Sequence, residues 1–525
     1  MLKGTNFIGF AESKKGSKNL QSFSPVKNAL LSKEFAIATE EEVNEAVIKS
    51  AAAFQLYKNV TPEIKAQFLE TIAAEIMALG DVLIERAMLE TGLPEARLVG
   101  ERGRTTGQLK LFAEVLREGS WVEAVIDEAL PERKPLPRSD IRKMLVPLGT
   151  VVVFGASNFP FAFSTAGGDT ASALAAGNTV IVKAHESHLG TNEMVASAII
   201  NAAKKCNLPD GIFSSVTGEG YVTGMQLVKH EAVKAVGFTG SYNAGMAIYK
   251  AACNERKEPI PVYAEMSSIN PVLILPDELA KDTGKVATQI AGSVTLGVGQ
   301  FCTNPGLLFL VEDENSISFI NQLKDKLAAI PAGVMLNKNI CNGYYSNKQK
   351  VADENVVTTL LAGENNSDDV KGAAALLQVK AKDFIANELL QVEMFGPATM
   401  VVLCGNKNEM KEALQSLHGQ LTGTVIGNTN DVKYFSECVS TLESKVGRII
   451  YNGVPTGVEV CYAMVHGGPY PATTDARSTS VGADAIKRFA RPMCWQDFPK
   501  ELLPAALQDE NPLNILRRVN GVFTR

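Results

Sequence analysis

The sequence feature that most limits what this chain can fold into is a repeated pairing of a short apolar run with a helical stretch. Thr150–Phe154 (TVVVF) and Thr179–Lys183 (TVIVK) are β-branched runs, and residues 212–216 and 233–238 follow in the same style. Each run leads into a turn with glycine or serine and then into a helical stretch, such as the Ala-rich segment 165–176. Continuous apolar strands that alternate with helices predict a parallel, doubly wound sheet.

The pattern recurs further along, so one sheet does not account for the chain. A second α/β region begins with the apolar run 271–275 (PVLIL) and extends to about residue 457. Because 525 residues exceed what one hydrophobic core usually holds, two or three domains are expected. Residues 128–143 are rich in proline and in mixed charge, which predicts an extended excursion or hairpin. Apolar residues at three-four spacing predict helices ahead of the first sheet, at 41–58, 62–78, 81–91 and 95–117.

Composition bears mainly on the partners and the compartment to expect. The net charge of −6 disfavours nucleic acid, which would need a basic face. No apolar run is long enough to span a membrane and the N-terminus lacks the pattern of an export signal, so a cytoplasmic protein is expected. The eight cysteines include no C-x-x-C pair, which is typical of reduced thiols in a cytosol.

Two glycine-bearing turns indicate where a cofactor could bind. One strand leads into the turn 218–224 (GEGYVTG), whose third glycine comes one residue later than the usual dinucleotide fingerprint demands. This spacing alone fits a plain glycine-rich turn as well as a phosphate site. The next strand ends in the turn 238–241 (FTGS), which opens another helical stretch. Neighbouring strands that end in this way predict a ligand crevice at the carboxyl edge of the sheet.

Three side chains could carry chemistry. Cys302 ends a glycine-bearing loop (GVGQFC, 297–302), where a thiol could be held open to a substrate. Asn158 follows the first strand and could donate a hydrogen bond to a developing oxyanion. Glu265 follows a short apolar run and could act as a base toward water. Each also has a plain alternative, namely a buried cysteine, a turn asparagine and a solvated carboxylate at a strand end.

Two other kinds of site are disfavoured. The pair His185-x-x-His188 lacks a third ligand at a recognised spacing, and the chain has only five histidines, so no metal is expected. A serine hydrolase is disfavoured because no G-x-S-x-G elbow occurs.

Taken in order, these segments resemble the aldehyde dehydrogenase superfamily over roughly residues 30 to 500. That family shows an Asn-Phe-Pro after a strand, a lysine ending the next strand, a Phe-Thr-Gly-Ser turn, a glutamate, a Gly-Gln-x-Cys loop and a Glu-x-Phe-Gly-Pro segment. Six motifs in this order are too many for chance agreement. This chain has them at Asn158-Phe159-Pro160, Lys183, Phe238-Thr239-Gly240-Ser241, Glu265, Gly299-Gln300-Phe301-Cys302 and Glu393-Met394-Phe395-Gly396-Pro397.

The resemblance implies oxidation of an aldehyde to its carboxylic acid with NAD or NADP. Cys302 would attack the carbonyl as a thiolate, and Asn158 together with the Cys302 N–H would hold the resulting oxyanion. Hydride would then leave to the nicotinamide, which Glu393 and Phe395 would position. Water deprotonated by Glu265 would finally hydrolyse the thioester.

The resemblance also implies which residues contact the cofactor. Lys183 would bind the adenosine ribose hydroxyls, with His185 and Glu186 at the same edge. An acid at position 186 disfavours a 2′-phosphate, and Tyr221 stands where NADP-preferring relatives often carry an arginine, so NAD is favoured. The subfamily considered below often uses NADP, which favours NADP over NAD. The remaining implied cofactor contacts are Phe154, Gly218, Gly220, Thr239, Gly240 and Ser241.

The implied fold is an aldehyde dehydrogenase-like α/β architecture with a Rossmann-type cofactor domain, a second α/β catalytic domain and a small β oligomerisation excursion. The NAD(P)-binding domain would comprise residues 1–127 and 149–263, and the catalytic domain with the cysteine residues 264–457. Residues 128–148 and 458–525 would form the oligomerisation and C-terminal segments. A homodimer or homotetramer is expected.

Departures from the common family pattern point to a substrate. Glu265 is followed by Met-Ser-Ser instead of Leu-Gly-Gly. The usual Pro-Phe-Gly-Gly-x-Lys-x-Ser-Gly is replaced by the segments 455–458, 465–475, 477–482 and 488–492. With GERGRTTGQL at 100–109, these segments resemble family members that oxidise 2,5-dioxopentanoate (alpha-ketoglutarate semialdehyde) to 2-oxoglutarate. The far carboxylate of that substrate favours a planar cation as its partner. Substrate-binding candidates are Arg102, Arg104, Arg477 and Phe159, although each arginine could equally serve in a structural ion pair or at a subunit contact.

Three alternatives stay open. A broad-range aliphatic aldehyde dehydrogenase would use the same chemistry on other substrates. A CoA-acylating dehydrogenase would pass the acyl group to CoA and would not need Glu265 as a base. A non-redox thiol acyltransferase or an inactive scaffold would form no reduced cofactor.

Overall fold

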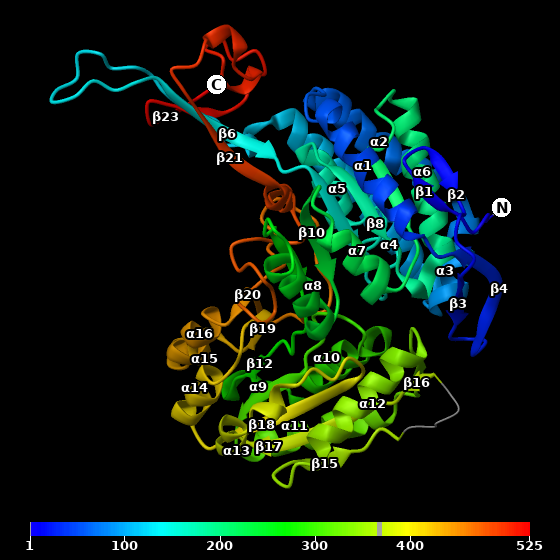
Figure 1. The fold of residues 1–525 in the computed structure, drawn as a ribbon. Helices are drawn as coiled ribbons and strands as arrows, with labels where there is room; N and C mark the ends of the chain where they lie inside the picture. Colours follow the sequence, from blue (N-terminus) through cyan, green and yellow to red (C-terminus); the bar gives the residue numbers. More distant parts are fainter. Residues whose placement is uncertain (1, 365–369) are drawn as a thin grey trace.

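The computed structural model describes residues 2–364 and 370–525, which are arranged as two α/β bodies with an arm (Figure 1). The first body is coloured blue to green and the second green to orange. The arm is long and narrow, and the red C-terminal segment joins it. Within the described ranges, no helix has both the length and the apolar character needed to cross a lipid bilayer.

The first body is built on a seven-stranded sheet. Five neighbouring strands, from one edge inward, are parallel, and two antiparallel strands form the other edge. The four strands predicted from the first apolar runs are all present, because valine and isoleucine side chains are buried along them. The strand order is β11 (Val262–Glu265), β10 (Val233–Thr239), β7 (Thr150–Phe154), β8 (Thr179–Lys183), β9 (Phe213–Val216), β1 (Asn6–Ile8) and β2 (Ala11–Ser13).

Helices cover both faces of this sheet. Val151 and Val153 pack into one hydrophobic cluster and Val152 into another, as the alternation of side chains along a strand requires. The four predicted N-terminal helices are confirmed, and Thr39 and Thr61 cap the first two. The helices of this body are α1 (Glu40–Tyr57), α2 (Pro62–Ala78), α3 (Gly80–Thr91), α4 (Glu95–Glu118), α5 (Gly168–Ala176), α6 (Leu189–Lys205), α7 (Met225–Lys229) and α8 (Tyr242–Asn254).

The order of the strands reverses next to β7. β8 and β9 lie on one side of β7, whereas β10 and β11 lie on the other. Open α/β sheets bind ligands at such a reversal, outside the carboxyl ends of the strands. The segments that follow β7 and β10 carry Asn158 and Ser241, so both residues lie at the edge where a ligand is expected.

The second body contains another seven-stranded sheet, parallel except at the pairing of β15 with β17, which confirms the second predicted α/β region. β13 is the central strand of this sheet, and Cys302 lies in the loop that precedes it. The strand order is β15 (Thr358–Leu361), β17 (Ala375–Lys380), β18 (Ala398–Cys404), β13 (Leu307–Val311), β12 (Val272–Ile274), β19 (Gln420–Ile426) and β20 (Val446–Tyr451). The helices of this body are α9 (Pro276–Lys281), α10 (Thr283–Thr295), α11 (Glu314–Ala328), α12 (Lys338–Ala352), α13 (Ala381–Ala386), α14 (Lys407–Gln415), α15 (Thr429–Tyr434) and α16 (Ser436–Glu443).

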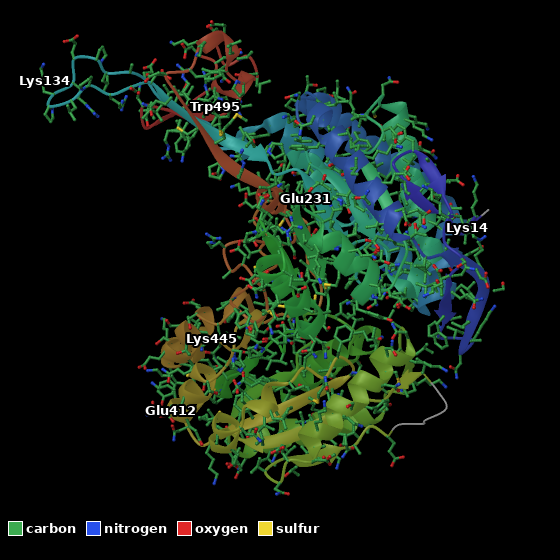
Figure 2. The ribbon with its side chains drawn as sticks, in the orientation of Figure 1. Lys14, Lys134, Glu231, Glu412, Lys445 and Trp495 are labelled. Carbon is green, nitrogen blue, oxygen red and sulfur yellow. The ribbon has the colours of Figure 1, made fainter. Side chains whose placement is uncertain are left out.

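The arm carries a five-stranded sheet, and the proline-rich stretch forms its outer loop. Figure 2 shows Lys134 at the tip of this loop and Trp495 closer to the body. The buried guanidinium of Arg142 bonds to Asp140 and Asp509 and so holds the arm to the C-terminal segment. The strand order is β21 (Ala490–Gln496), β6 (Ile141–Pro147), β5 (Val125–Asp127), β22 (Arg517–Val519) and β23 (Val522–Thr524). Two further strand pairs are β3 (Asn19–Ser24) with β4 (Ala29–Ala36) and β14 (Gly333–Val334) with β16 (Lys371–Gly372).

Only part of the segment 458–525 joins the sheet of the arm. The stretch 466–480 lies instead against the end of β11, where Met266 N–H donates to the Ala472 carbonyl and Glu265 forms a bridge with Thr473. The domain limits expected from the sequence remain a prediction. This stretch nevertheless brings a third part of the chain to the carboxyl edge of the first sheet.

Candidate active site

Three side chains from distant parts of the chain meet between the two bodies. Glu265 ends β11, Cys302 lies in the loop ahead of β13, and His466 begins the stretch 466–480. A carboxylate oxygen, the sulfur and a ring nitrogen of these residues all lie within 4.8 Å of one another. Cys302 and Glu265 were predicted from the sequence, whereas His466 was not. The signal that could have found His466 is its place directly before Gly467-Gly468, where the common family segment reads Phe-Gly-Gly.

The Cys302 loop is held in a backbone conformation that few residues adopt. Gly299 has φ +66°, and a Cβ there would stand 2.2 Å from the Gly396 carbonyl oxygen, so only glycine fits. Val298 has φ +59°, which is strained for a β-branched residue. The buried Asn270 donates from Nδ2 to the carbonyl oxygen of Cys302 at 2.8 Å and to a second loop carbonyl at 2.9 Å. One amide thus fixes the backbone of the thiol-bearing residue.

Glu265 is buried and has partners on both carboxylate oxygens. Oε1 lies 3.0 Å from His466 Nε2, and Oε2 accepts a hydrogen bond from Ser480 Oγ at 2.8 Å. Burial acts to raise the pKa of Glu265, but His466 and Ser480 outweigh it and leave that pKa below its usual range. Glu265 is therefore a carboxylate at neutral pH.

The Cys302 sulfur faces the same two groups. It lies 3.5 Å from His466 Nε2, and it is hydrogen-bonded to Glu265. Burial and the Glu265 charge raise the pKa of the Cys302 thiol well above its ordinary value. The resting residue is therefore a thiol, and a partner must stabilise the thiolate for it to act as a nucleophile.

The segment after β7 is fixed by charged side chains of α4. The Glu101 carboxylate accepts hydrogen bonds from Phe161 N–H at 2.8 Å and Ala162 N–H at 3.0 Å. Arg97 donates to the Asn158 backbone carbonyl at 2.7 Å. The Asn158 side chain donates from Nδ2 to the Gln300 carbonyl at 3.0 Å, next to the Cys302 loop. The amide predicted to hold an oxyanion is thus adjacent to the thiol loop, with a second N–H still available.

Aromatic rings and arginines line the approach to this amide. The Arg97 guanidinium lies over the Phe159 ring at 4.9 Å and over the Phe301 ring at 4.8 Å. The Arg104 guanidinium lies 5.0 Å from the centre of the Phe163 ring. Both Arg104 Nη atoms are buried and have no hydrogen-bond partner among the described residues.

The other two arginine candidates lie in different settings. Arg102 is buried and donates to the Gly80 carbonyl at 2.7 Å, between α3 and α4. The side chain of Arg477 is 92% exposed and pairs with Asp475. Arg104 interacts electrostatically with Cys302 and Glu265. The structure therefore places Arg104 near the Cys302 thiol.

Residues predicted to contact a cofactor lie around the carboxyl ends of β7 to β10. The Lys183 ammonium is buried and pairs with the half-exposed Glu186. Burial lowers the pKa of His185 to about 3, so its ring is neutral, and it stacks on His188. Ser241 caps α8 at the end of the turn that contains Thr239 and Gly240.

Packing explains the residues at two further predicted cofactor positions, the glycine turn after β9 and the last residue of β7. A Cβ at Gly218 would stand 1.9 Å from Thr223 Oγ1, so the turn requires glycine there, whereas the position of Gly220 is open. The Phe154 side chain packs in the core against Phe238, so only its backbone lies at the strand end.

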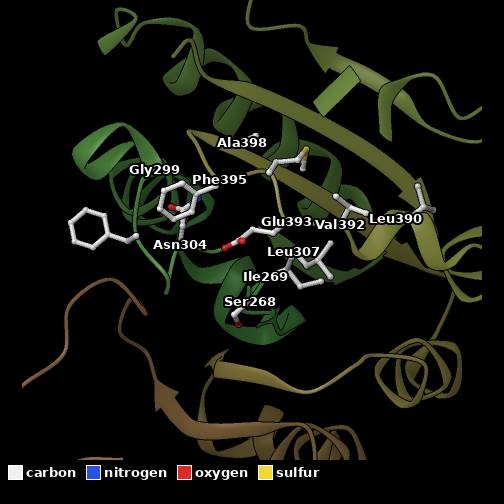
Figure 3. Close-up of a pocket in the computed structure, with 13 residues that line it drawn as sticks. Ser268, Ile269, Gly299, Asn304, Leu307, Leu390, Val392, Glu393, Phe395 and Ala398 are labelled. Atoms are coloured by element: carbon white, nitrogen blue, oxygen red, sulfur yellow. The ribbon is translucent and has the colours of Figure 1, made fainter. Parts of the chain in front are cut away.

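Glu393 and Phe395 line a pocket on the other side of the Cys302 loop. Figure 3 shows the Glu393 carboxylate turned toward the same part of this pocket as Asn304 and Phe395. Burial raises the pKa of Glu393 to about 7, although hydrogen bonds from Ser267 and the Ser268 backbone act in the opposite sense. A pocket acid, a buried lysine and a helix N-terminus are groups that can bind the hydroxyl and diphosphate groups of a nicotinamide dinucleotide.

Comparison with known proteins gives one consistent family. The profile of the "Aldehyde dehydrogenase family" matches residues 10–482. The chain is 51% identical over 522 residues to alpha-ketoglutaric semialdehyde dehydrogenase 2 of Azospirillum brasilense, covering 99% of each chain. It is 45% identical over 492 residues to alpha-ketoglutaric semialdehyde dehydrogenase of Acinetobacter baylyi, covering 94% of this chain and 93% of that one.

Solved structures at low sequence identity share the fold. A Thermus 1-pyrroline-5-carboxylate dehydrogenase with bound NAD superposes with a TM-score of 0.77 at 20% identity, covering 94% of this chain and 92% of that one. An NADP-dependent glyceraldehyde-3-phosphate dehydrogenase from Bacillus halodurans, complexed with NADP, gives 0.78 at 21% identity, covering 94% and 99%. The predicted arrangement of a Rossmann-type domain and a second α/β domain is confirmed.

The amide of Asn270 generates a prediction about the Cys302 loop. Asn270→Gly removes the side chain without penalising the positive φ of this residue, and it leaves two buried carbonyls unpaired. We expect a loss of about 2 kcal/mol in the free energy of unfolding, measured by urea titration. The exposed Asn59→Gly change is the control. Equal stability of Asn270→Gly and the wild type would contradict the role assigned to the amide.

Proposed function

The chain belongs to the aldehyde dehydrogenase family, and from this premise we propose that it oxidises alpha-ketoglutaric semialdehyde (2,5-dioxopentanoate) to 2-oxoglutarate with NAD or NADP. The observation that carries the substrate is the near full-length identity to two enzymes named for that semialdehyde. Arg104 supports it independently, because its two Nη atoms are buried without a hydrogen-bond partner among the described residues and suit a substrate with a carboxylate at its far end.

The first chemical step is the attack of Cys302 on the aldehyde. The sulfur, as a thiolate, bonds to the carbonyl carbon, and the electron pair of the C=O bond moves to oxygen. The free N–H of the Asn158 amide and the Cys302 backbone N–H stabilise that oxyanion. One such donor typically lowers the barrier by about 3 kcal/mol.

Oxidation then requires a hydride acceptor. A bound NAD or NADP supplies it through its nicotinamide. Glu393 would hold the ribose hydroxyls of the nicotinamide half, and Phe395 would help to position the nicotinamide. Lys183 and Glu186 would bind the adenosine ribose, and the turns 218–220 and 239–241 would hold the diphosphate. Glu186 disfavours an additional phosphate on this ribose, so we propose NAD as the preferred cofactor.

Hydrolysis completes the cycle. Glu265 takes a proton from water, the hydroxyl oxygen bonds to the thioester carbon, and the carbon–sulfur bond breaks. Because its pKa is lowered, the Glu265 carboxylate is a weak base. Its contribution to the rate of hydrolysis therefore depends more on its position next to the thioester than on its basicity.

The substrate is oriented by its far carboxylate. Arg104 extends from α4 toward the cysteine, and its two free Nη groups match the two oxygens of a carboxylate. The rings of Phe159, Phe163 and Phe301 enclose the carbon chain between Arg104 and Cys302. An aliphatic aldehyde would leave the Arg104 donors unpaired, which favours the dioxo acid.

The remaining predictions concern the setting of the enzyme. We propose a cytoplasmic homodimer or homotetramer assembled through the arm. The proposed domain limits are 1–127 with 149–263, 264–457, and 128–148 with 458–525.

A panel of aldehydes assayed with each cofactor tests the function. We expect a higher kcat/KM for 2,5-dioxopentanoate than for hexanal, and a higher one with NAD than with NADP, measured by absorbance at 340 nm. A clear preference for hexanal would overturn the substrate and favour the broad-range alternative. Formation of acyl-CoA in the presence of CoA would favour the acylating alternative, and no reduced cofactor would contradict a dehydrogenase.

The proposed role of Glu265 predicts a specific kinetic defect. Glu265→Gln cannot take the proton from water, so the thioester accumulates. We expect a single equivalent of reduced cofactor per subunit followed by a stall, measured by rapid mixing and by mass spectrometry of the acylated Cys302. Glu501→Gln, at an exposed position, is the control. Steady turnover by Glu265→Gln would remove the residue from this role.

The proposed role of Arg104 predicts a change in selectivity. Arg104→Leu should raise KM for 2,5-dioxopentanoate on the order of tenfold or more, because a charge-assisted bond to the carboxylate is lost. Hexanal has no carboxylate, so its kcat/KM should change little. Arg477→Leu is the exposed control and should leave both substrates unaffected. An equal loss for both substrates would indicate a structural role for Arg104.

The raised pKa of Glu393 predicts that cofactor binding depends on pH. Only the carboxylate form accepts charge-assisted hydrogen bonds from the ribose hydroxyls. With a pKa of about 7, the carboxylate fraction rises as pH increases through 7. NAD should therefore bind more tightly at pH 8 than at pH 6, measured by fluorescence titration, and Glu393→Gln should reduce this difference. An unchanged difference in the variant would assign the pH dependence to another group.

A further inference from the structure

His466 is a buried titratable group that the mechanism above does not use. Its Nε2 lies 3.0 Å from the Glu265 carboxylate and 3.5 Å from the Cys302 sulfur. Its backbone is fixed by the Thr479 side chain, and its ring lies beside that of Phe163. The ring is therefore held between the proposed nucleophile and the proposed base.

The surroundings of the ring determine which nitrogen carries the proton. Nδ1 is buried and has no hydrogen-bond partner among the described residues. A buried N–H without an acceptor destabilises the folded protein, whereas Nε2 faces a carboxylate oxygen that can accept a hydrogen bond. Nε2 therefore carries a proton and donates it to the Glu265 carboxylate.

We propose that His466 activates Cys302 by donating its Nε2–H to the sulfur once the thiol has lost its proton to Glu265. This inference deepens the proposed function, since it concerns the same cysteine. The raised pKa of the Cys302 thiol is consistent with the need for such a donor. His466 is then a catalytic residue, because it contacts the reacting atom.

The step involves proton transfer alone. The S–H bond of Cys302 breaks and an O–H bond forms on Glu265, while the sulfur keeps the electron pair. Because Glu265 loses its charge, the Nε2–H of His466, which lies 3.5 Å from the sulfur, is donated to the negatively charged sulfur in place of the carboxylate. Nothing is oxidised or reduced. Glu265 then releases the proton of the thiol to solvent and is a carboxylate again before it takes a proton from water. In Glu265→Gln the thiol loses its proton directly to solvent, so the single burst of reduced cofactor still forms, but more slowly. When the carbon–sulfur bond breaks at the end of the cycle, the same N–H stabilises the departing thiolate.

Other charged groups also face the sulfur. Arg104 and Arg448 favour the thiolate electrostatically, whereas Glu393 opposes it. Arg448 is engaged with the carbonyls of Pro455 and Gly457. Among the described residues neither arginine forms a hydrogen bond with the sulfur, and the donor that reaches it is His466.

Alkylation of Cys302 in the cofactor-free enzyme tests the inference. The rate with iodoacetamide is measured across pH by peptide mass spectrometry for the wild type, His466→Phe, His466→Gln and His466→Asn. The exposed Cys494 is an internal reference in every sample. A glutamine places its amide nitrogen near the position of Nε2, and a shorter asparagine places it near Nδ1. The two amide variants therefore differ in whether a donor reaches the sulfur.

We expect His466→Phe and His466→Asn to alkylate Cys302 roughly tenfold or more slowly at pH 7.5, with the pH profile displaced upward. His466→Gln should stay close to the wild type. Equal profiles for the wild type, glutamine and asparagine variants would overturn the proposal, even if His466→Phe failed to fold. Because no aldehyde is used, a failure of the substrate assignment would leave these profiles unchanged.

Discussion

The arrangement of the active site depends on one buried carboxylate. Glu265 ends a strand of the first sheet, and its two oxygens are held by His466 and Ser480 from the C-terminal third of the chain. It also faces Cys302, which the second body supplies. A buried carboxylate must have such partners to remain charged. The contacts of this single carboxylate therefore join three parts of the molecule at the candidate active site.

Much of the fold could be predicted from sequence because its signals are local. The run 150–154 is apolar after its first residue because both of its faces are buried, and Thr39 with Glu42 marks a helix start within a few residues. Cys302, Glu265 and Asn158 were found through motifs of ordered spacing. The glycine turn at 218 was ambiguous from spacing, and the need for glycine there appears only in the packing of Thr223.

The parts that could not be predicted depend on tertiary contacts. His466 is separated from Cys302 by 164 residues and from Glu265 by 201, so no local pattern could pair them. The same holds for Asn270, an ordinary asparagine by sequence that fixes the Cys302 backbone. Arg102 and Arg104 are two residues apart on α4 and so point in different directions, and only the packed helix shows which one faces the cysteine.

The connection between the active site and the arm has a further consequence. Ser480 is followed by the short 3-10 helix Ala483–Phe489, and β21 begins at the next residue and pairs along β6. Because this connecting segment is short and largely buried, the sheet of the arm cannot move far relative to the residues that hold Glu265. The arm thus anchors the segment that holds the Glu265 carboxylate, and removing the arm would weaken the support of this buried group.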